Sequence, residues 1–312
     1  MHFRADSDHL RLFRDVVSHK SISKGAAANG ISQSAASQHI QELERRLDAT
    51  LLDRSTRPFT VTETGRRYLK FCQEVIHRCE AVEAELEQLK NEVSGTLRVA
   101  AIYSVGLTTM SEVEETFRAR FPAASLEVTY LRPERIYQSV EKELCDIGLL
   151  SYPEPTRELE VIPWLNETMV LGAAPDHPLA RKSSVAPGEI DGAAFIGFDH
   201  DLPIRAHIDR FLREHKVHVQ RVMNFDNIQM IKEALVLGRG VAILPLRMMD
   251  AEIQDGRLRA IRIDTDGLIR PLGIIYRRKR PLSRVARQFC DLLQREFSES
   301  GAGVSPALAA AR

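Results

Sequence analysis

The sequence predicts a multidomain α+β protein: a helical N-terminal head, one long connecting helix and a larger α/β half. Short capped helices fill the first 50 residues, an apolar seam follows between residues 72 and 93, and strand and helix patterns then alternate from residue 96. The chain has 312 residues, of which 44% are hydrophobic and 28% charged, so two or more globular domains are expected.

The head reads as three helices. Asp6 or Ser7 can cap a first helix, and a second, Lys24–Ala28, ends at Asn29-Gly30, where left-handed backbone angles are tolerated. The third begins after Ser32, whose hydroxyl can cap it. Two short helices, a tight turn and a longer helix are typical of a helix-turn-helix. The buried face of the third helix is expected at Ala36, Ile40, Leu43 and Leu47.

The opposite face of the third helix is uncharged, polar and short. Glutamine can pair with adenine, serine can bond to bases or phosphates, and a helix N-terminus attracts phosphate. This composition favours a helix that lies against DNA over an ordinary capped surface helix. The expected DNA contacts on this helix are Ser32, Gln33, Ser34, Ser37 and Gln38.

The sequence after this helix predicts a wing, which is a small hairpin beside the helices. Leu51 and Leu52 can pack beneath the helices, a turn spans residues 54–58, and a short extended return follows. Arg54 and Arg57 would then touch phosphate or enter the minor groove; a solvated loop is the alternative. Arg45 and Arg46 are either backbone contacts or solvated charges at a helix end.

A long helix is expected from Thr62, which can cap it, to about Glu92. Its apolar positions alternate by three and four, as in the seam of a coiled coil. Such a seam needs a partner helix, and a second copy of the chain is the preferred partner over packing within its own domain. The seam positions are Cys72, Val75, Cys79, Val82, Leu86, Leu89 and Val93.

The remaining chain alternates between strands and helices, which predicts α/β layers with a largely parallel sheet. If the last strand and helix return to the first half, two lobes result, with crossings near 162–167 and 265–271. The tail 298–312 has no periodicity and is expected to be disordered. Strands are expected at 96–102, 126–130, 146–150, 168–174, 194–198, 221–225, 240–244, 258–263 and 272–276, and helices at 105–120, 133–144, 204–215, 227–237 and 282–297.

Charge and cysteine usage narrow the function classes. The net charge is zero, but residues 1–78 hold 13 Lys and Arg against 9 Asp and Glu, while residues 79–92 hold five Glu and one Lys.

No apolar run is long enough for a membrane span and no signal peptide is recognisable, so a cytoplasmic protein without membrane contact is expected. The cysteines lack metal-ligand spacing; reduced thiols are expected, with a redox sensor as the alternative, and no metal or cofactor is expected. The cysteines are Cys72, Cys79, Cys145 and Cys290.

The head resembles the winged helix-turn-helix of the LysR-type transcriptional regulators. That family pattern reads roughly Ser-Gln, three residues on Ser, then Ile, Leu-Glu, Leu-Phe-x-Arg and Thr-x-x-Gly. The resemblance extends by layout and length over nearly the whole chain. The family usually has other residues at Gly25, Asn29, Asp48 and Leu52, and Gly25 is expected to weaken its helix by up to ~1 kcal/mol relative to alanine. The matching residues are Ser32, Gln33, Ala36, Ser37, Ile40, Leu43, Glu44, Leu47, Leu51, Arg54, Thr62 and Gly65.

The resemblance implies a cytoplasmic regulator that binds an operator with dyad symmetry, commonly as a dimer of dimers. A small inducer would bind between two lobes like those of periplasmic binding proteins, and RNA polymerase is a further expected partner. The implied domains are 1–62 for DNA binding, 63–94 for dimerisation and 95–297 for the effector, with lobe I at 95–164 and 268–297 and lobe II at 165–267.

Positions in the family pattern imply the effector site. Ser104 resembles a hydroxyl that commonly meets an inducer carboxylate, and Arg132 would favour an anion. Asp199 and Asp201 argue against a multiply anionic ligand in the second lobe, or for a ligand with an amine. The candidates are Ile102, Ser104, Val105, Arg132 and Ser151 in the first lobe, and Asp199, His200, Asp201 and Asn227 in the second.

Other function classes remain as alternatives. An enzyme is disfavoured because no P-loop, HExxH or GxSxG motif occurs, and Gly238-Arg-Gly240 lacks the third glycine of a dinucleotide fingerprint and precedes its strand. A solute-binding protein would suit the α/β half but leaves the basic head unexplained. An architectural DNA-binding protein without effector response is the third alternative.

Overall fold

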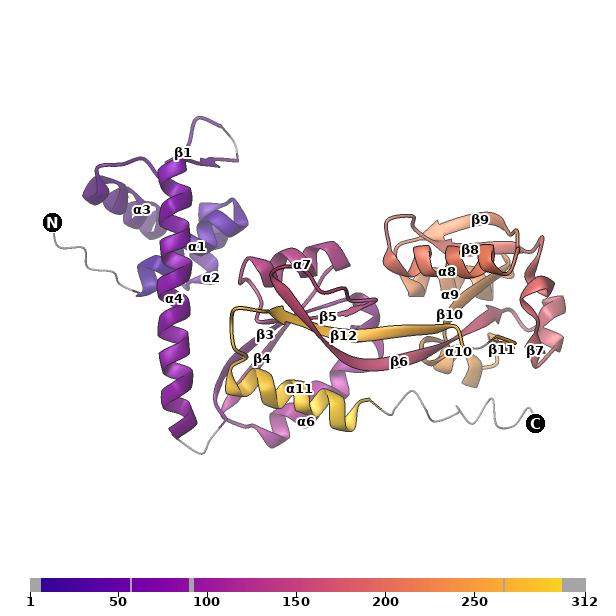
Figure 1. Cartoon of the computed structure of the whole chain (residues 1–312). Helices are drawn as coiled ribbons and strands as arrows, with labels where there is room; N and C mark the ends of the chain where they lie inside the picture. Colours follow the sequence, from indigo (N-terminus) through magenta and orange to yellow (C-terminus); the bar gives the residue numbers. More distant parts are fainter. Residues whose placement is uncertain (1–6, 57, 90–92, 266, 299–312) are drawn as a thin grey trace. The chain divides into compact units, whose positions relative to one another are not determined.

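The computed structural model describes residues 7–56, 58–89, 93–265 and 267–298. The chain divides into two compact units, one within residues 1–92 and one within 93–312 (Figure 1). The end of the expected linker helix at 90–92 and the expected disordered tail from residue 299 lie outside the described residues. The proposed domain boundaries therefore remain predictions beside this two-unit division.

The first unit contains the three expected head helices, a small wing and a long helix. Ser21 and Ser32 cap the second and third helices through their hydroxyls, as local sequence predicts. Buried side chains of all four helices and of the wing form one core. The elements are α1 Ser7–His19, α2 Ile22–Ala28, α3 Gln33–Leu47, the antiparallel pair β1 Leu52–Asp53 and β2 Thr60–Val61, and α4 Glu63–Leu89.

The expected seam of α4 divides into two parts. Cys72 is fully buried in the head core, and Tyr68 meets Phe13 edge-to-face at 5.1 Å between ring centroids. Further along, Cys79 and Val82 are exposed within this unit. The start of the helix thus packs within its own domain, because α1 covers it. Pairing of the seam with a second copy of the chain stays a prediction, for the part of α4 beyond this point.

Packing, and not helix propensity, explains glycine at position 25. A Cβ atom at this position would lie 2.4 Å from Val16 Cγ2 and 2.6 Å from Val16 Cα. Glycine therefore allows α1 and α2 to approach, so alanine here would clash instead of strengthening the helix. Asn29, where the family usually has leucine, donates from Nδ2 to Asp15 Oδ2 at 2.9 Å and to the Gly25 carbonyl at 2.9 Å, which fastens the end of α2 to α1.

The second unit consists of two α/β lobes joined by two crossing strands. In the first lobe, α7 covers one face of the sheet, and α6 and α11 cover the other (Figure 1). The first lobe contains β3 Gly95–Ala101, α5 Tyr103–Thr108, α6 Met110–Arg120, β4 Ala124–Tyr130, α7 Pro133–Glu141, β5 Ile147–Ser151 and α11 Arg284–Glu296. The second contains β7 Ser184–Val185, β8 Ala194–Phe198, α8 Pro203–Glu214, β9 Gln220–Phe225, α9 Ile228–Val236, β10 Val241–Pro245, α10 Asp250–Gln254 and β11 Arg259–Ile263.

The crossing strands are β6 Leu159–Ala173 and β12 Ile269–Arg277, which pair antiparallel along their length. The sheet order through the described residues is β4-β3-β5-β12-β6-β10-β8-β9. β3, β4 and β5 are parallel, as are β8, β9 and β10, but β12 and β6 run antiparallel to their neighbours. The expected largely parallel sheet is thus mixed, because the chain crosses between lobes once in each direction.

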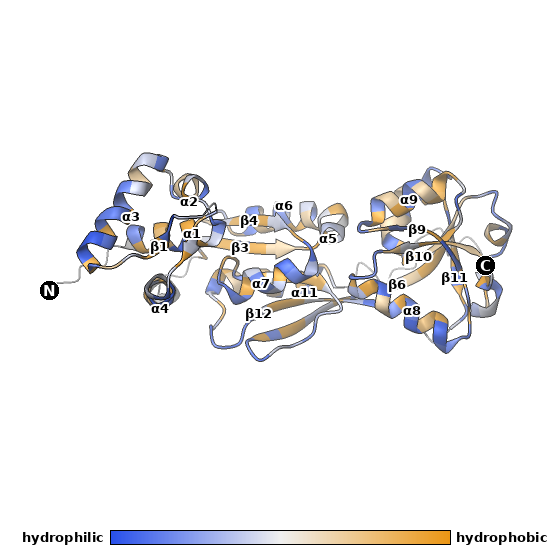
Figure 2. Cartoon of the chain, turned by 90° about the horizontal axis from the view of Figure 1, so that it is seen from above, coloured by the Kyte–Doolittle hydropathy of each residue, from blue (hydrophilic) through white to orange (hydrophobic). Residues whose placement is uncertain are grey.

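Two separate hydrophobic cores hold the lobes, one in each. Hydrophobic residues concentrate on the strands, whereas α3 of the first unit is largely hydrophilic (Figure 2). The expected helix 105–120 is in fact two helices that meet at Thr109. No helix in the described part of the chain is long and apolar enough to cross a membrane.

Candidate functional site

The first candidate site is the exposed face of α3. Ser32 Oγ accepts the Ala35 N–H at 3.2 Å and lies 2.9 Å from Ser34 Oγ. Ala36 and Ile40 are buried at 0% and 1% exposure, so the helix is held from behind by apolar packing. The opposite face presents uncharged donors and acceptors that can reach base edges. On this face Gln33, Ser34 and Gln38 are exposed and Ser37 is half-buried.

Glu44 joins this helix to the wing. Its Oε1 accepts the backbone N–H groups of Leu51 at 2.8 Å and Leu52 at 3.0 Å, and its Oε2 accepts from Arg54 at 3.0 Å. The predicted wing residue Arg54 is therefore held beside the C-terminal end of α3, and its side chain is 39% exposed. Arg57 lies outside the described residues. The family pattern contained Glu44, but sequence reasoning did not assign it this role.

The wing is also tied to the start of α4. Thr62 Oγ1 donates to the Thr50 carbonyl at 2.7 Å and accepts the Gly65 N–H at 2.9 Å. A Cβ atom on Gly65 would lie 2.2 Å from the Leu51 carbonyl oxygen, so only glycine allows this approach. At the same C-terminal end of α3, Arg45 pairs with Glu42, which agrees with a solvated charge.

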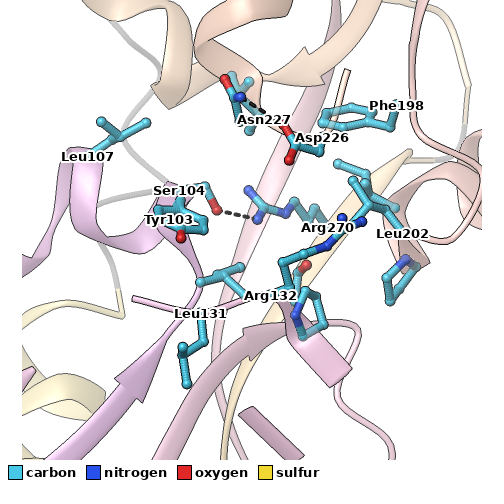
Figure 3. A pocket seen from close by; sticks show the side chains of 16 residues that line it. Tyr103, Ser104, Leu107, Leu131, Arg132, Phe198, Leu202, Asp226, Asn227 and Arg270 are labelled. Carbon is cyan, nitrogen blue, oxygen red and sulfur yellow. Dashed lines mark hydrogen bonds between the residues drawn. The ribbon is translucent and has the colours of Figure 1, made fainter. Parts of the chain in front are cut away.

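The second candidate site is a cleft between the two lobes of the second unit (Figure 3). It contains about 580 Å³ of space, part of it open to solvent. Both lobes contribute to its walls, mostly with apolar side chains. Its lining consists of Ile102, Tyr103, Ser104, Leu107, Leu131, Arg132, Pro133, Ser151, Phe198, Leu202, Pro203, Ile204, Asp226, Asn227, Ile228 and Arg270.

Five of the nine effector residues proposed from the sequence line this cleft: Ile102, Ser104, Arg132, Ser151 and Asn227. The structure does not bring the other four to its walls. Val105 is 2% exposed in the core of the first lobe, because its side chain points into the helix packing. Asp199, His200 and Asp201 lie between β8 and α8, outside the lining. Contact with an effector stays a prediction for all nine.

Arg270 is the main residue that sequence reasoning missed. It is 3% exposed on β12, directly opposite Glu167 on β6. Its guanidinium donates to Glu167 Oε2 at 2.9 Å and to Ser104 Oγ at 2.6 Å, whereas its Nε is buried without an acceptor in the described part of the chain (Figure 3). Its strand was expected to begin only at Leu272; the signal was an arginine directly before an otherwise apolar run.

Two contacts bridge the lobes beside the cleft. Arg132, at the start of α7, donates to Asp201 Oδ2 at 2.7 Å. Tyr152, after β5, stacks on His207 of α8 with 3.8 Å between ring centroids. Burial lowers the pKa of His207, as does the neighbouring Arg210, while Glu154 opposes this shift. Burial also raises the pKa of Tyr152 to about 12.

The cysteines and acidic groups form no metal-binding cluster among the described residues. No cluster of three or more His, Cys, Asp or Glu side chains is placed to hold a metal ion there. The four thiols are free. Burial raises the pKa of Cys72 and Cys290 to about 12 and of Cys145 to about 11, so these three are protonated at neutral pH and poor nucleophiles.

Comparison with known proteins agrees with this architecture. Residues 7–66 match the family described as bacterial regulatory helix-turn-helix protein, lysR family, and residues 90–298 match LysR substrate binding domain. The chain is 29% identical over 289 residues to a probable RuBisCO transcriptional regulator of Cyanidioschyzon merolae, covering 91% of this chain and 95% of that protein.

Solved structures share the fold. Full-length OxyR C199D from Pseudomonas aeruginosa superposes with a TM-score of 0.76 at 16% identity, covering 98% of this chain and all of that one. The CcmR regulatory domain of Synechocystis, solved in complex with 2-PG, gives a TM-score of 0.60 at 22% identity and covers 66% of this chain and all of that one. With both family regions matched along its length, the chain belongs to the LysR family of transcriptional regulators, with a DNA-binding helix-turn-helix and an effector-binding substrate domain.

Proposed function

We propose that this protein binds a dyad-symmetric operator as paired copies, with α3 in the major groove, and that a small effector in the cleft controls this binding. The observation that carries the DNA-binding part is the polar face of α3, capped at Ser32 and backed by buried Ala36 and Ile40. Dyad symmetry follows from pairing, because two copies of one helix related by a two-fold axis read inverted half-sites.

Pairing is supported by the outer part of α4. Cys79 and Val82 continue the seam beyond the head core and are exposed within the unit. A second copy of this helix would cover them, which gives a dimer, and contacts between substrate domains would extend it to a tetramer. The protein would act in the cytoplasm, where operator DNA and its further partner RNA polymerase are found, and it would catalyse no reaction.

The effector part is supported by the cleft and by the crossing strands. A ligand held by both lobes changes their relative arrangement only if its affinity differs between arrangements. Both lobes line the cleft here, so their closure can alter the assembly that holds two heads on DNA. CcmR, whose regulatory domain was solved with 2-PG, supports a small-molecule ligand in a domain of this fold.

The DNA-binding proposal is tested by titrating the full chain against its upstream intergenic DNA at several salt concentrations. Gln33→Ala should lower discrimination between operator and unrelated DNA by roughly 1–3 kcal/mol, because it removes a bidentate base contact. Arg54→Ala should weaken all sequences alike and reduce the salt slope by about one. Unchanged operator affinity in Gln33→Ala would contradict the placement of α3.

An architectural DNA-binding protein without effector response is the second candidate, supported only by the same α3 face. Thermal melting with a metabolite library separates the two. A ligand that binds the native cleft should raise the melting temperature at concentrations above its Kd. An architectural protein should bind the operator but show no shift with any compound.

A further inference from the structure

The cleft offers a hydrogen-bonding cation on its first-lobe side. Arg270 is 3% exposed and its Nε is buried without an acceptor among the described residues. Ser104 Oγ lies 2.6 Å from the same guanidinium, and Ser151 contributes a second hydroxyl to the lining. A guanidinium with hydroxyls beside it is suited to a carboxylate, which accepts several charge-assisted hydrogen bonds.

The second lobe offers a carboxylate. Asp226 is exposed at the end of β9 and its carboxyl group faces into the cleft toward the Arg270 side (Figure 3). It accepts one hydrogen bond, from Asn227 Nδ2 at 2.9 Å, and forms no ion pair with any described residue. A carboxylate that faces a partly enclosed, apolar cleft favours a cationic or strongly donating ligand group.

The two arginines of the cleft are each paired with a carboxylate, whereas Asp226 forms no ion pair with any described residue. Glu167 Oε2 lies 2.9 Å from Arg270, and Asp201 Oδ2 lies 2.7 Å from Arg132, although Nε of each arginine is buried without an acceptor among the described residues. A ligand with two or more negative charges would therefore meet two ion-paired guanidinium groups and the Asp226 carboxylate, which leaves these groups and their partners with a net negative charge. Electrostatics disfavours such a ligand and favours one with a negative group near Arg270 and a positive group near Asp226.

The remaining walls are apolar and lie beside these two charged groups. Figure 3 shows Phe198 and Leu202 on one side of Arg270 and Asp226, and Leu107 and Leu131 on the other. Apolar walls with a few placed polar groups are the usual composition of small-molecule sites. The apolar walls are suited to a ligand with an aliphatic or aromatic side chain.

We propose that the effector is a small zwitterion of the amino-acid class: one carboxylate held by Arg270 and Ser104, one ammonium group held by Asp226, and an apolar body. This proposal rests on the proposed function, since it names the ligand of the same cleft. Because Ser104 belongs to the first lobe, Arg270 to the crossing strand β12 and Asp226 to the second lobe, the ligand would contact both lobes, which neither an acid nor an amine alone would do.

The test uses the full chain and matched probes in calorimetric titration and thermal melting. Leucine and phenylalanine are compared with 4-methylpentanoate and 3-phenylpropanoate, which lack the amine, and with isoamylamine and phenethylamine, which lack the acid. At least one amino acid should bind tenfold or more tightly than both of its analogues. If each amino acid has an analogue, acid or amine, that binds within tenfold of it or more tightly, or if neither amino acid binds, the proposal is overturned.

Two variants locate the charged ends. Asp226→Asn should lower the affinity of the amino acid about tenfold without lowering that of the acid analogue, which loses only a repulsion. Glu214→Gln makes the same change of charge on the exposed end of α8 and should leave all affinities unchanged. Arg270→Gln alone would leave Glu167 buried without its partner. The double variant Arg270→Gln/Glu167→Gln is therefore compared with the single variant Glu167→Gln. Binding that depends on the carboxylate of the ligand should be lost only in the double variant.

Operator binding is measured on the same samples. If the protein binds its operator and responds to a different ligand class, the zwitterion proposal fails and the proposed function stands. If the protein fails to bind DNA, the proposed function fails whatever the probes show.

Discussion

At the scale of single residues, Gly25 shows how a helix can require the residue that local propensity disfavours. A methyl group on this Cα would lie 2.4 Å from Val16 Cγ2 and within 2.7 Å of the Val16 backbone nitrogen. Backbone atoms cannot rotate away, so α1 and α2 would have to separate. The gain in helix propensity of up to ~1 kcal/mol is the smaller effect.

We therefore expect Gly25→Ala to destabilise the first unit by roughly 1–3 kcal/mol, the usual cost of overpacking. Chemical denaturation followed by circular dichroism measures this. Lys24→Ala changes an exposed position of the same helix and should alter the free energy of unfolding by less than about 0.5 kcal/mol. A more stable Gly25→Ala protein would show that the helices are farther apart than described.

Residues whose role is local were predictable from the sequence, and those with distant partners were not. Ser32 and Thr62 accept backbone N–H groups three residues away, so spacing alone identifies them as caps. Arg270 instead pairs with Glu167, 103 positions earlier, and with Ser104, 166 positions earlier. No periodicity within one segment contains that information.

At the scale of elements, the junction of α3 with the wing depends on one carboxylate. Glu44→Ala would leave the N–H groups of Leu51 and Leu52 without their acceptor and release Arg54. We expect a loss of stability of about 1–3 kcal/mol and faster hydrogen exchange at both amides. Glu42→Ala, which removes only the exposed pair with Arg45, is the control. Exchange at Leu51 and Leu52 that stays slow would contradict this role.

Helices were predicted better than the crossing strands. α8, α9 and α11 lie within two residues of their expected bounds, because each has a clear apolar stripe. Only the end of β6 was expected, since Pro163 and Glu167 interrupt the pattern of its first half. The structure accommodates this with a register shift opposite Leu272 and Gly273, and Trp164 donates from Nε1 to the Leu293 carbonyl at 3.1 Å.

At the scale of the whole molecule, the stack of Tyr152 on His207 makes the second unit sensitive to acid. The folded pKa of His207 is lowered, first by burial and then by Arg210, from an ordinary value of 6.5. The unfolded chain therefore takes up a proton first as pH falls, so stability present above about pH 6.5 declines below it. Melting temperatures between pH 7.5 and 5.5 should fall less steeply in His207→Gln than in the unmodified protein or in the exposed-site control His218→Gln.

The ion pair between Arg132 and Asp201 joins the two lobes, and we expect it to restrain their separation. Both side chains are partly exposed, at 36% and 48%, so the pair contributes at most about 1 kcal/mol to stability. Asp201→Asn should leave the melting temperature nearly unchanged. It should increase the separation between spectroscopic labels placed on α7 and α8. Identical label distances in both proteins would show that the pair does not restrain the lobes.

The place of β12 has a consequence for biosynthesis. This strand lies between β5 and β6 in the sheet of the first lobe, yet its residues 269–277 follow the entire second lobe in the chain. During translation the sheet of the first lobe lacks β12 until the ribosome has made the whole second lobe. The second lobe has its own core and can fold earlier. β12 and α11, which are made last, then complete the first lobe, so the second lobe of the nascent chain should become resistant to protease before the first lobe does.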